Sequence, residues 1–270
     1  MTASPTKGLI LGLALGAAVA LPAAAATAPA TNPLEPFDEF RNPVAPYKPA
    51  PPRMANGMPD WRGVWAPFGS RNMDPTTHSG ARQSPPFTEK GRIAYEAAQK
   101  ALEEGRSQTD IGCAPSGSPR IMRTPYPMEV VVTPEQTWVL SEFKGESRRI
   151  YTDGRKIPTD DELDYNFHGV SNGHWEGDTL VFDTIGLRAG TYDQAGLVHS
   201  DKLILHERMR RIDFNTLEDR ITMVDPEVFS APWTVTRHYK LRPEWTIKEF
   251  YCENERNPIG ADGRTTSVLK

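Results

Sequence analysis

The chain has 270 residues, and its 31 basic and 35 acidic residues give a formal net charge of -4 at pH 7. A protein that binds nucleic acid needs a basic surface to neutralise phosphates, so this slightly acidic balance argues against a nucleic-acid partner. The sequence also contains no C-x-x-C-H haem attachment motif, no G-x-S-x-G nucleophile elbow and no phosphate-binding glycine loop. These absences argue against c-type haem, serine hydrolases of the elbow type and nucleotide enzymes.

The N-terminal residues have the pattern of a secretory signal peptide. Lys7 precedes an apolar run over residues 8–21, and Ala24-Ala25-Ala26 matches the small-residue rule for the cleavage site. The apolar run is shorter than an ordinary membrane-spanning helix, and neither a twin arginine before it nor a cysteine soon after it is present. We therefore predict that residues 1–26 are removed and that the mature protein is periplasmic or secreted, with no membrane attachment. An uncut, membrane-anchored form is the alternative.

The two cysteines of the sequence, Cys113 and Cys252, fit an exported protein. An even pair of cysteines in an oxidising compartment usually forms a disulfide, so we predict a bridge between them. The alternative is a catalytic thiol, but neither cysteine has a histidine close to it in sequence.

A linker and a single domain are predicted after the signal peptide. Residues 27–60 contain nine prolines and little periodic apolar pattern, which is typical of an extended linker. Residues 61–270 have the length of one domain. One helix is predicted at about residues 88–104, with Thr88 as the N-cap and Gly105 as the stop.

Most of the domain has the alternating apolar pattern and the turn residues of β-strands. The predicted strands are residues 128–133, 137–143, 147–151, 173–175, 179–185, 202–212, 217–224, 233–241 and 245–252. Antiparallel strands in chain order on short connections favour an up-and-down, lipocalin-like barrel or a curved meander, and a β-sandwich is the second choice.

Two resemblances bear on this fold. Residues 60–65, DWRGVW, are similar to the G-x-W opening of lipocalin-like barrels, in which the Trp of the first strand fills one end of the barrel. The strings GCAPSGSPR at 112–120, RRIYTDGR at 148–155 and GHWEGDTL at 173–180 resemble a large family of mostly uncharacterised secreted proteobacterial proteins. The resemblance implies export and a β-rich fold, and it implies no particular reaction.

Three of the predicted strands each place one ionisable side chain on an otherwise apolar face. A period of two groups Glu207 with Leu203, Leu205 and Met209. By the same rule Arg237 shares a face with Trp233 and Tyr239, and Glu249 shares a face with Trp245 and Tyr251. We interpret Glu207, Arg237 and Glu249 as lining one cavity. The alternative is a buried structural ion-pair network, or strands facing the opposite way, which would leave these groups in solvent.

Four of the six histidines lie between residues 168 and 206. Their spacing lacks the H-E-x-x-H pattern of a helical zinc site, but His168, His174 and His199 lie near turns and are able to converge. Solvated or capping histidines are the more common outcome for loops, so no metal or other cofactor is predicted.

These features predict an exported enzyme that uses general acid–base chemistry, of the lyase or isomerase type, on a small organic molecule held in a β-barrel cavity. His168 would be the acid or base, Glu207 its carboxylate partner, and Arg237 with Tyr239 the donors to a developing oxyanion. Trp233 and Trp245 would form apolar walls, and Glu249 would contact the substrate. The alternatives are a non-catalytic carrier of a hydrophobic ligand and a metal-dependent enzyme that uses His168, His174 and His199.

Overall fold

A computed structural model describes residue 1 and residues 50–68, 85–104, 113–192 and 196–252. The chain divides into two compact units, Met1–Thr31 and Asn32–Lys270, and the described residues from 50 onward belong to the second unit. Beyond residue 1, the predicted signal peptide lies outside the described residues, as does the predicted linker up to residue 49.

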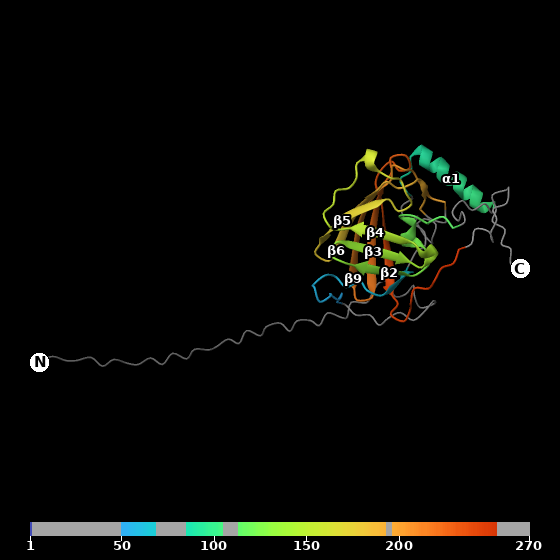
Figure 1. The fold of residues 1–270 in the computed structure, drawn as a ribbon. Coiled ribbons are helices and arrows are strands. Elements are labelled where there is room, and N and C mark those ends of the chain that lie inside the picture. Colours follow the sequence, from blue (N-terminus) through green and yellow to red (C-terminus); the bar gives the residue numbers. More distant parts are fainter. Residues whose placement is uncertain (2–49, 69–84, 105–112, 193–195, 253–270) are drawn as a thin grey trace. The chain divides into compact units, whose positions relative to one another are not determined.

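The second unit is mainly β, with a closed barrel of nine strands in the order β1-β11-β10-β9-β6-β5-β4-β3-β2 (Figure 1). The strands are β1 (Val64–Phe68), β2 (Met128–Val132), β3 (Gln136–Ser141), β4 (Ser147–Tyr151), β5 (Val170–Glu176), β6 (Thr179–Ile185), β9 (Ile204–Asp213), β10 (Thr216–Val224) and β11 (Trp233–Leu241). Neighbouring strands pair antiparallel, except that β4 pairs parallel with β5. The predicted fold class, a mainly β and largely up-and-down barrel with one helix, is confirmed.

Two features of the fold, one in the barrel and one beside it in sequence, were not predicted. The parallel pairing of β4 with β5 makes the barrel mixed, because the residues between these strands carry the chain back to the end at which β4 began. A separate two-stranded sheet, β7 (Gly190–Thr191) with β8 (Val198–His199), is inserted between β6 and β9. Strands of two residues leave too short an alternation to be recognised in a sequence.

The barrel has two ends that hold different side chains. We call the end at which β2, β4, β5 and β9 begin end A, and the end at which they finish end B. Trp61 precedes β1 at end B, where it is fully buried and packs edge-on against Trp175 with 5.1 Å between ring centroids. The indole N–H of Trp65 donates to the backbone carbonyl of Trp61 at 2.9 Å. Aromatic side chains therefore fill this end of the barrel.

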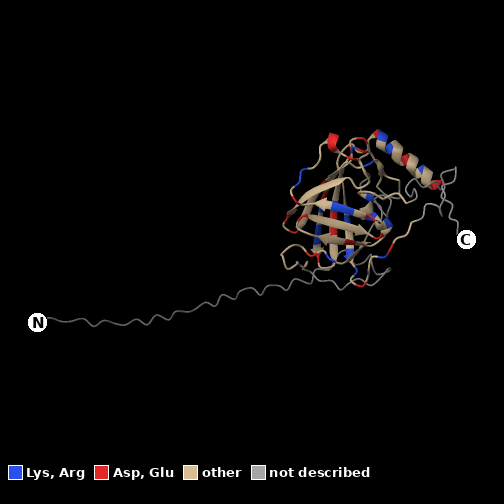
Figure 2. Ribbon diagram, in the orientation of Figure 1, with Lys and Arg blue, Asp and Glu red and all other residues tan. Residues whose placement is uncertain are grey.

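Alternation along β9 shows why these residues form a strand. Leu205, Glu207 and Met209 are buried, whereas the intervening His206 and Arg208 are exposed. Successive side chains of a strand point to opposite faces, so the first set lies inside the barrel and the second set outside. The predicted inward facing of Glu207 is confirmed. Figure 2 shows basic and acidic residues interspersed over the barrel strands and the helix.

The helix, α1 (Glu89–Glu103), begins and ends close to the predicted positions. Thr88 is its N-cap, and the Thr88 hydroxyl accepts the backbone N–H of Gly91 at 3.0 Å. Gly91 is needed because a Cβ there would lie 2.2 Å from the carbonyl oxygen of Val228. This close approach packs the first turn of α1 against the residues that lead into β11. Ile93 of this helix is exposed.

The predicted last strand, residues 245–252, is wrong. These residues pair with no strand, because β11 is already bonded to β10 on one edge and to β1 on the other. A closed barrel has no free edge for another strand. The segment instead runs outside the barrel: the backbone N–H of Lys248 donates to Glu142 at 2.9 Å, and Phe250 packs against Phe143.

The predicted disulfide is confirmed. Cys113 and Cys252 are joined, with their Cα atoms 5.7 Å apart and a sequence separation of 139 residues. The bridge ties the C-terminal segment to the loop that precedes β2. Disulfides persist in oxidising environments, so this bond indicates an oxidising compartment.

Candidate functional site

The interior of the barrel holds Glu207 in an ion pair with Arg148 of β4. Arg148 donates from Nη1 to Glu207 Oε1 at 2.9 Å and from Nη2 to the other carboxylate oxygen, and neither side chain is exposed. Arg148 Nη2 also donates to the hydroxyl of Thr184 at 2.8 Å. The sequence predicted Arg237 as the cation that would answer Glu207 if its role were structural. The structure places Arg148 there instead.

A second carboxyl group, Asp219 of β10, lies beside this pair. Burial raises the pKa of Asp219 well above its usual range, and the nearby Glu207 carboxylate raises it further. No donor among the described residues reaches either carboxyl oxygen of Asp219. A protonated carboxyl group is uncharged and carries its own O–H donor, so it is buried without a donor at less cost than a carboxylate.

Arg237 and Tyr239 of β11 complete the interior network. Arg237 lies opposite Asp219 in the β10–β11 register, and both are buried. The Tyr239 hydroxyl donates to the backbone carbonyl of Met122, and burial raises the pKa of Tyr239 above its usual range. The Tyr239 donor is thus directed at the protein itself and not at a cavity.

The remaining residues of the predicted cavity do not lie together, because one is inside the barrel and two are outside it. Trp233 is buried in the core, where its ring lies 5.4 Å from that of Phe229. Trp245 and Glu249 belong to the segment outside the barrel, and Glu249 is exposed. The prediction that Glu249 shares a cavity with Glu207 and Arg237 is therefore wrong, because it assumed a strand at 245–252. The interior geometry matches the alternative, a buried ion-pair network.

His168 lies at end A, and the carboxylate beside it is Glu146, not Glu207. His168 Nε2 is 3.3 Å from Glu146 Oε2, and His168 Nδ1 is 3.4 Å from the hydroxyl oxygen of Ser118. Glu146 immediately precedes β4, His168 lies just before β5, and Ser118 lies in the loop before β2. The barrel thus brings together positions that are far apart in sequence. We call Ser118, Glu146 and His168 the His168 cluster.

Glu146 holds the loop of the cluster as well as the histidine. Its carboxylate accepts the backbone N–H of Ser116 at 2.6 Å and that of Gly117 at 3.2 Å. Burial alone would raise the pKa of Glu146, but the bonds from His168 and Ser116 outweigh burial and lower this pKa below its usual range. Glu146 is therefore ionised at neutral pH.

The backbone around the cluster is fixed by two further features. Gly117 has a φ of +75°, and a Cβ there would lie 2.4 Å from the carbonyl oxygen of Phe167, so this position requires glycine. The side-chain oxygen of Asn166 accepts the backbone N–H of His168 at 3.0 Å and that of Gly169 at 2.8 Å. The loop that carries Ser118 and the loop that carries His168 are thus held by specific contacts.

Exposure distinguishes the members of the cluster. The His168 side chain is 21% exposed, whereas that of Glu146 is 4% exposed. Ser118 is buried. The imidazole is consequently the member that faces solvent, and a buried, ionised carboxylate lies behind it.

The other two histidines of the proposed metal set lie in different surroundings. His174 is 66% exposed on β5 and lies 3.3 Å from Glu176. His199 is buried, its Nδ1 is 3.0 Å from the carbonyl oxygen of Ser200, and burial lowers its pKa. In the part of the chain that the structure describes, no three His, Cys, Asp or Glu side chains form a group that would hold a metal ion. His168, His174 and His199 therefore do not come together, and the arrangement that the metal-dependent alternative requires is not formed.

The sequence reasoning did not find Glu146, Ser118, Arg148 or Asp219. Arg148 was detectable, because a period of two over residues 147–151 places it on the same face as the apolar Ile150. Asp219 alternates with Leu217 and Ile221 in the same way. Glu146 and Ser118 lie in loops, where no periodicity marks the side chains that point toward one another.

No family model, curated protein or solved structure matches this chain. Among the described residues, the structure contains no helix that is long and apolar enough to cross a membrane.

Proposed function

We propose that the protein is an exported enzyme whose His168 carries out general acid–base chemistry on a small organic substrate at end A. The observation that carries the proposal is the pairing of a partly exposed imidazole with a buried, ionised Glu146 at 3.3 Å. Histidine titrates near neutral pH, and an ionised carboxylate behind it fixes the ring and stabilises the imidazolium that forms when the ring accepts a proton. Removal and return of a proton are the steps that lyases and isomerases share.

Each member of the His168 cluster has a distinct role in this proposal. In this proposal the N–H at Nε2 of His168 donates a hydrogen bond to the Glu146 carboxylate, so Nδ1 is the unprotonated, basic nitrogen. The Ser118 hydroxyl lies 3.4 Å from Nδ1 and donates to it in the resting state. Nδ1 has a single lone pair, so the Ser118 hydroxyl releases it before Nδ1 takes a proton from the substrate. Glu146 and Ser118 are positioning residues, and His168 exchanges the proton with the substrate.

The interior residues have a structural role in this proposal. Glu207, Arg237 and Tyr239 are buried and face other protein groups, so we assign them to stability and not to the reaction. The carrier alternative receives less support. A hydrophobic ligand needs an apolar cavity, whereas the barrel interior around Glu207 carries charged groups that are fully buried.

Export to the periplasm or to the medium is part of the same proposal. The signal-peptide pattern at residues 1–26 and the resemblance to secreted proteobacterial proteins both point to it. The disulfide between Cys113 and Cys252 supports it, because such a bond persists outside the reducing cytosol.

Proton exchange provides a test that works before the substrate has been identified. The mature protein would be incubated in D₂O with a panel of small carbonyl compounds and hydroxy acids, and deuterium uptake at the acidic C–H would be followed by NMR. We expect catalysed exchange for at least one compound. The variant His168→Gln should lose about 10²- to 10⁴-fold of the rate, since that is the usual contribution of a general acid–base group.

The matched control is His174→Gln. His174 lies at the same 3.3 Å distance from a carboxylate, that of Glu176, but both side chains are largely exposed on the outer face of the barrel. This variant should keep the wild-type exchange rate. Full activity of His168→Gln, or no exchange by the wild type with any compound of the panel, would count against the proposal.

A further inference from the structure

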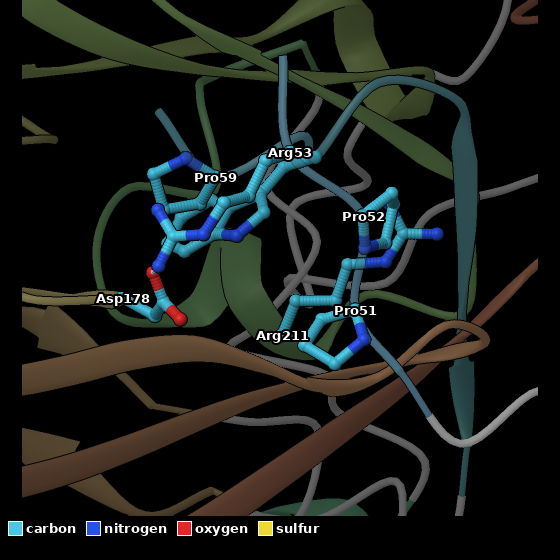
Figure 3. A pocket seen from close by; sticks show the side chains of 7 residues that line it. Pro51, Pro52, Arg53, Pro59, Asp178 and Arg211 are labelled. Carbon is cyan, nitrogen blue, oxygen red and sulfur yellow. Dashed lines mark hydrogen bonds and ion pairs between the residues drawn. The ribbon is translucent and has the colours of Figure 1, made fainter. Parts of the chain in front are cut away.

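The β3–β4 connection, residues 142–146, lies at end A and carries Glu146 of the His168 cluster. At end B, the ion pair of Arg53 with Asp178 and the side chain of Arg211 lie around a hollow that has room for only about one water (Figure 3). The β3–β4 connection, by contrast, is contacted by two segments from distant parts of the sequence, and a covalent bond joins these segments.

The first segment is the loop before β2. Lys144 of the β3–β4 connection donates from Nζ to the backbone carbonyl of Ala114 at 2.6 Å. The carboxylate of Glu146 accepts the backbone N–H of Ser116 at 2.6 Å and that of Gly117 at 3.2 Å. Three hydrogen bonds therefore join this loop to the connection, and two of them end on the carboxylate that faces the imidazole of the cluster.

The second segment is the C-terminal one, which runs outside the barrel. The backbone N–H of Lys248 donates to Glu142 at 2.9 Å, and the ring of Phe250 lies 5.1 Å from that of Phe143. The disulfide joins this segment to the loop before β2. We call the disulfide, together with the two segments that it joins, the clasp. The clasp thus contacts the β3–β4 connection from both of its segments.

The backbone of the β3–β4 connection is strained at Lys144. Its φ is +58°, and it is the one residue other than glycine with a positive φ in the ranges that the structure describes. This left-handed conformation is unfavourable for a residue with a Cβ and persists only where surrounding contacts hold it. The clasp supplies such contacts, because Nζ of Lys144 binds Ala114 and also lies over the ring of Phe143, against which Phe250 packs. Opening the clasp therefore favours relaxation of the connection.

The disulfide is accessible from solvent on one side. Cys252 is exposed, whereas Cys113 is half-buried. A disulfide is reduced when a thiolate attacks one of its sulfurs and the other sulfur leaves as a thiolate. A reductant therefore reaches Cys252 more readily, and Cys113 is the leaving group.

We propose that the disulfide between Cys113 and Cys252 is a redox switch of the His168 cluster. With the bond formed, the clasp holds Glu146 against His168. With the bond reduced, the β3–β4 connection relaxes and Glu146 moves away from His168. The regulation of activity rests on the function proposed above for His168, whereas the movement of Glu146 does not depend on it.

The reductant in this proposal is a dithiol, either a protein or a small molecule. One of its thiolates attacks Sγ of Cys252, the S–S bond breaks, and Cys113 leaves as a thiolate. The second thiol of the reductant then displaces Cys252 from the mixed disulfide. Two electrons pass to the cysteines, the two protons of the dithiol end on them, and the reductant becomes a disulfide.

Carboxyl modification measures the movement of Glu146 without any substrate. A water-soluble carbodiimide with a small amine converts accessible carboxylates to amides, and mass spectrometry maps the modified residues. Glu146 is 4% exposed and should react slowly in the oxidised wild type. In the double variant Cys113→Ser/Cys252→Ser, which stands for the reduced state, we expect Glu146 to react faster by about tenfold or more, because the opened clasp exposes it.

Two other carboxylates are the controls in the same experiment. Glu176 is 47% exposed on the outer face of the barrel, so it should react equally fast in both proteins. Glu207 is fully buried in the barrel interior, so it should stay unmodified in both proteins as long as the barrel is folded. A change confined to Glu146 therefore distinguishes opening of the clasp from unfolding.

Reduction of the wild type tests the switch itself. A small dithiol without denaturant should convert Cys113 and Cys252 to thiols, slow the catalysed proton exchange that depends on His168, and allow the rate to return after reoxidation. No exchange by the oxidised wild type would count against the proposed function alone, because the modification of Glu146 is measured without a substrate.

Four outcomes would overturn the inference. Equal modification of Glu146 in the wild type and the double variant would show that the clasp does not hold it. Modification of Glu207 in the double variant would show that the protein unfolds, whereas a switch needs two folded states. Thiols that appear only after a denaturant is added would show that the bond is not reducible in the folded protein. An exchange rate that reduction leaves unchanged would show that the clasp does not regulate His168.

Discussion

At the scale of single residues, Glu207 and Asp219 show how position decides the state of a carboxyl group. Both face the barrel interior from neighbouring strands, β9 and β10. Glu207 accepts two hydrogen bonds from Arg148, whereas Asp219 accepts none among the described residues. Glu207 therefore neutralises the arginine, whereas burial raises the pKa of Asp219.

The raised pKa of Asp219 predicts a loss of stability as pH rises. The folded protein holds this proton at pH values at which the unfolded chain, with an ordinary pKa near 3.8, has released it. The stabilisation is complete below that value and declines as pH rises toward the folded-state pKa, because the folded state then binds more protons than the unfolded state. Asp219→Asn mimics the neutral form and should remove this part of the pH dependence. Urea unfolding of both proteins between pH 4 and pH 9 measures it, and parallel curves would contradict the assignment.

Glu207→Gln should destabilise the protein by about 3–5 kcal/mol, because it leaves Arg148 buried without its carboxylate. Asp219 lies near enough to ionise in place of Glu207, so adding Asp219→Asn should enlarge the loss beyond the sum of the two single effects. Glu176→Gln is the control, since it breaks the exposed pair with Arg208, which is worth at most about 1 kcal/mol. Chemical denaturation gives all of these values. A melting temperature of Glu207→Gln near that of the wild type would instead favour the catalytic role predicted from sequence.

At the scale of elements, the sequence was most informative where one face of a strand is buried. The predicted strands 217–224 and 233–241 agree with β10 and β11 within one residue, because each alternates more buried and less buried side chains over most of its length. Residues 245–252 have the same local pattern and form no strand. Outside the barrel, Arg242 lies over the ring of Trp245, and Phe250 packs against Tyr126. Periodicity alone does not distinguish such a segment from a barrel strand.

The candidate site was less predictable than the strands for a related reason. Inward facing is a local property, so Glu207 was placed correctly. The partner of a buried charge depends on which strands meet across the barrel, so Arg148 was missed. The His168 cluster depends on three loops and on the parallel pairing of β4 with β5, which brings the residues before both strands to end A. No spacing rule contains that information.

At the scale of the whole unit, the two ends of the barrel are specialised in different ways. End A carries a histidine between an ionised carboxylate and a hydroxyl. End B carries the buried guanidinium of Arg211 and the buried ring of Trp61, whose indole N–H has no acceptor among the described residues. The fully buried pair of Arg148 and Glu207 lies in the barrel interior. The barrel interior is therefore filled by charged side chains that pair with one another, and the His168 cluster at end A is the feature of this barrel that bears on the proposed function.

The disulfide between Cys113 and Cys252 should be a major source of stability for the unit. It closes a loop with a sequence separation of 139 residues, and the chain-entropy model assigns a loop of that size about 4–5 kcal/mol. The double variant Cys113→Ser/Cys252→Ser should therefore unfold at a much lower urea concentration than the wild type. Wild-type protein treated with a thiol reductant should unfold at the same urea concentration as the double variant, and the reductant should not change the unfolding of the variant itself.

The disulfide also holds the segment just before Ser116, whose backbone N–H donates to Glu146. Hydrogen exchange at residues 116–118 should therefore be faster in the double variant than in the wild type. Equal unfolding midpoints for the oxidised wild type and the double variant would show that the bond adds no stability.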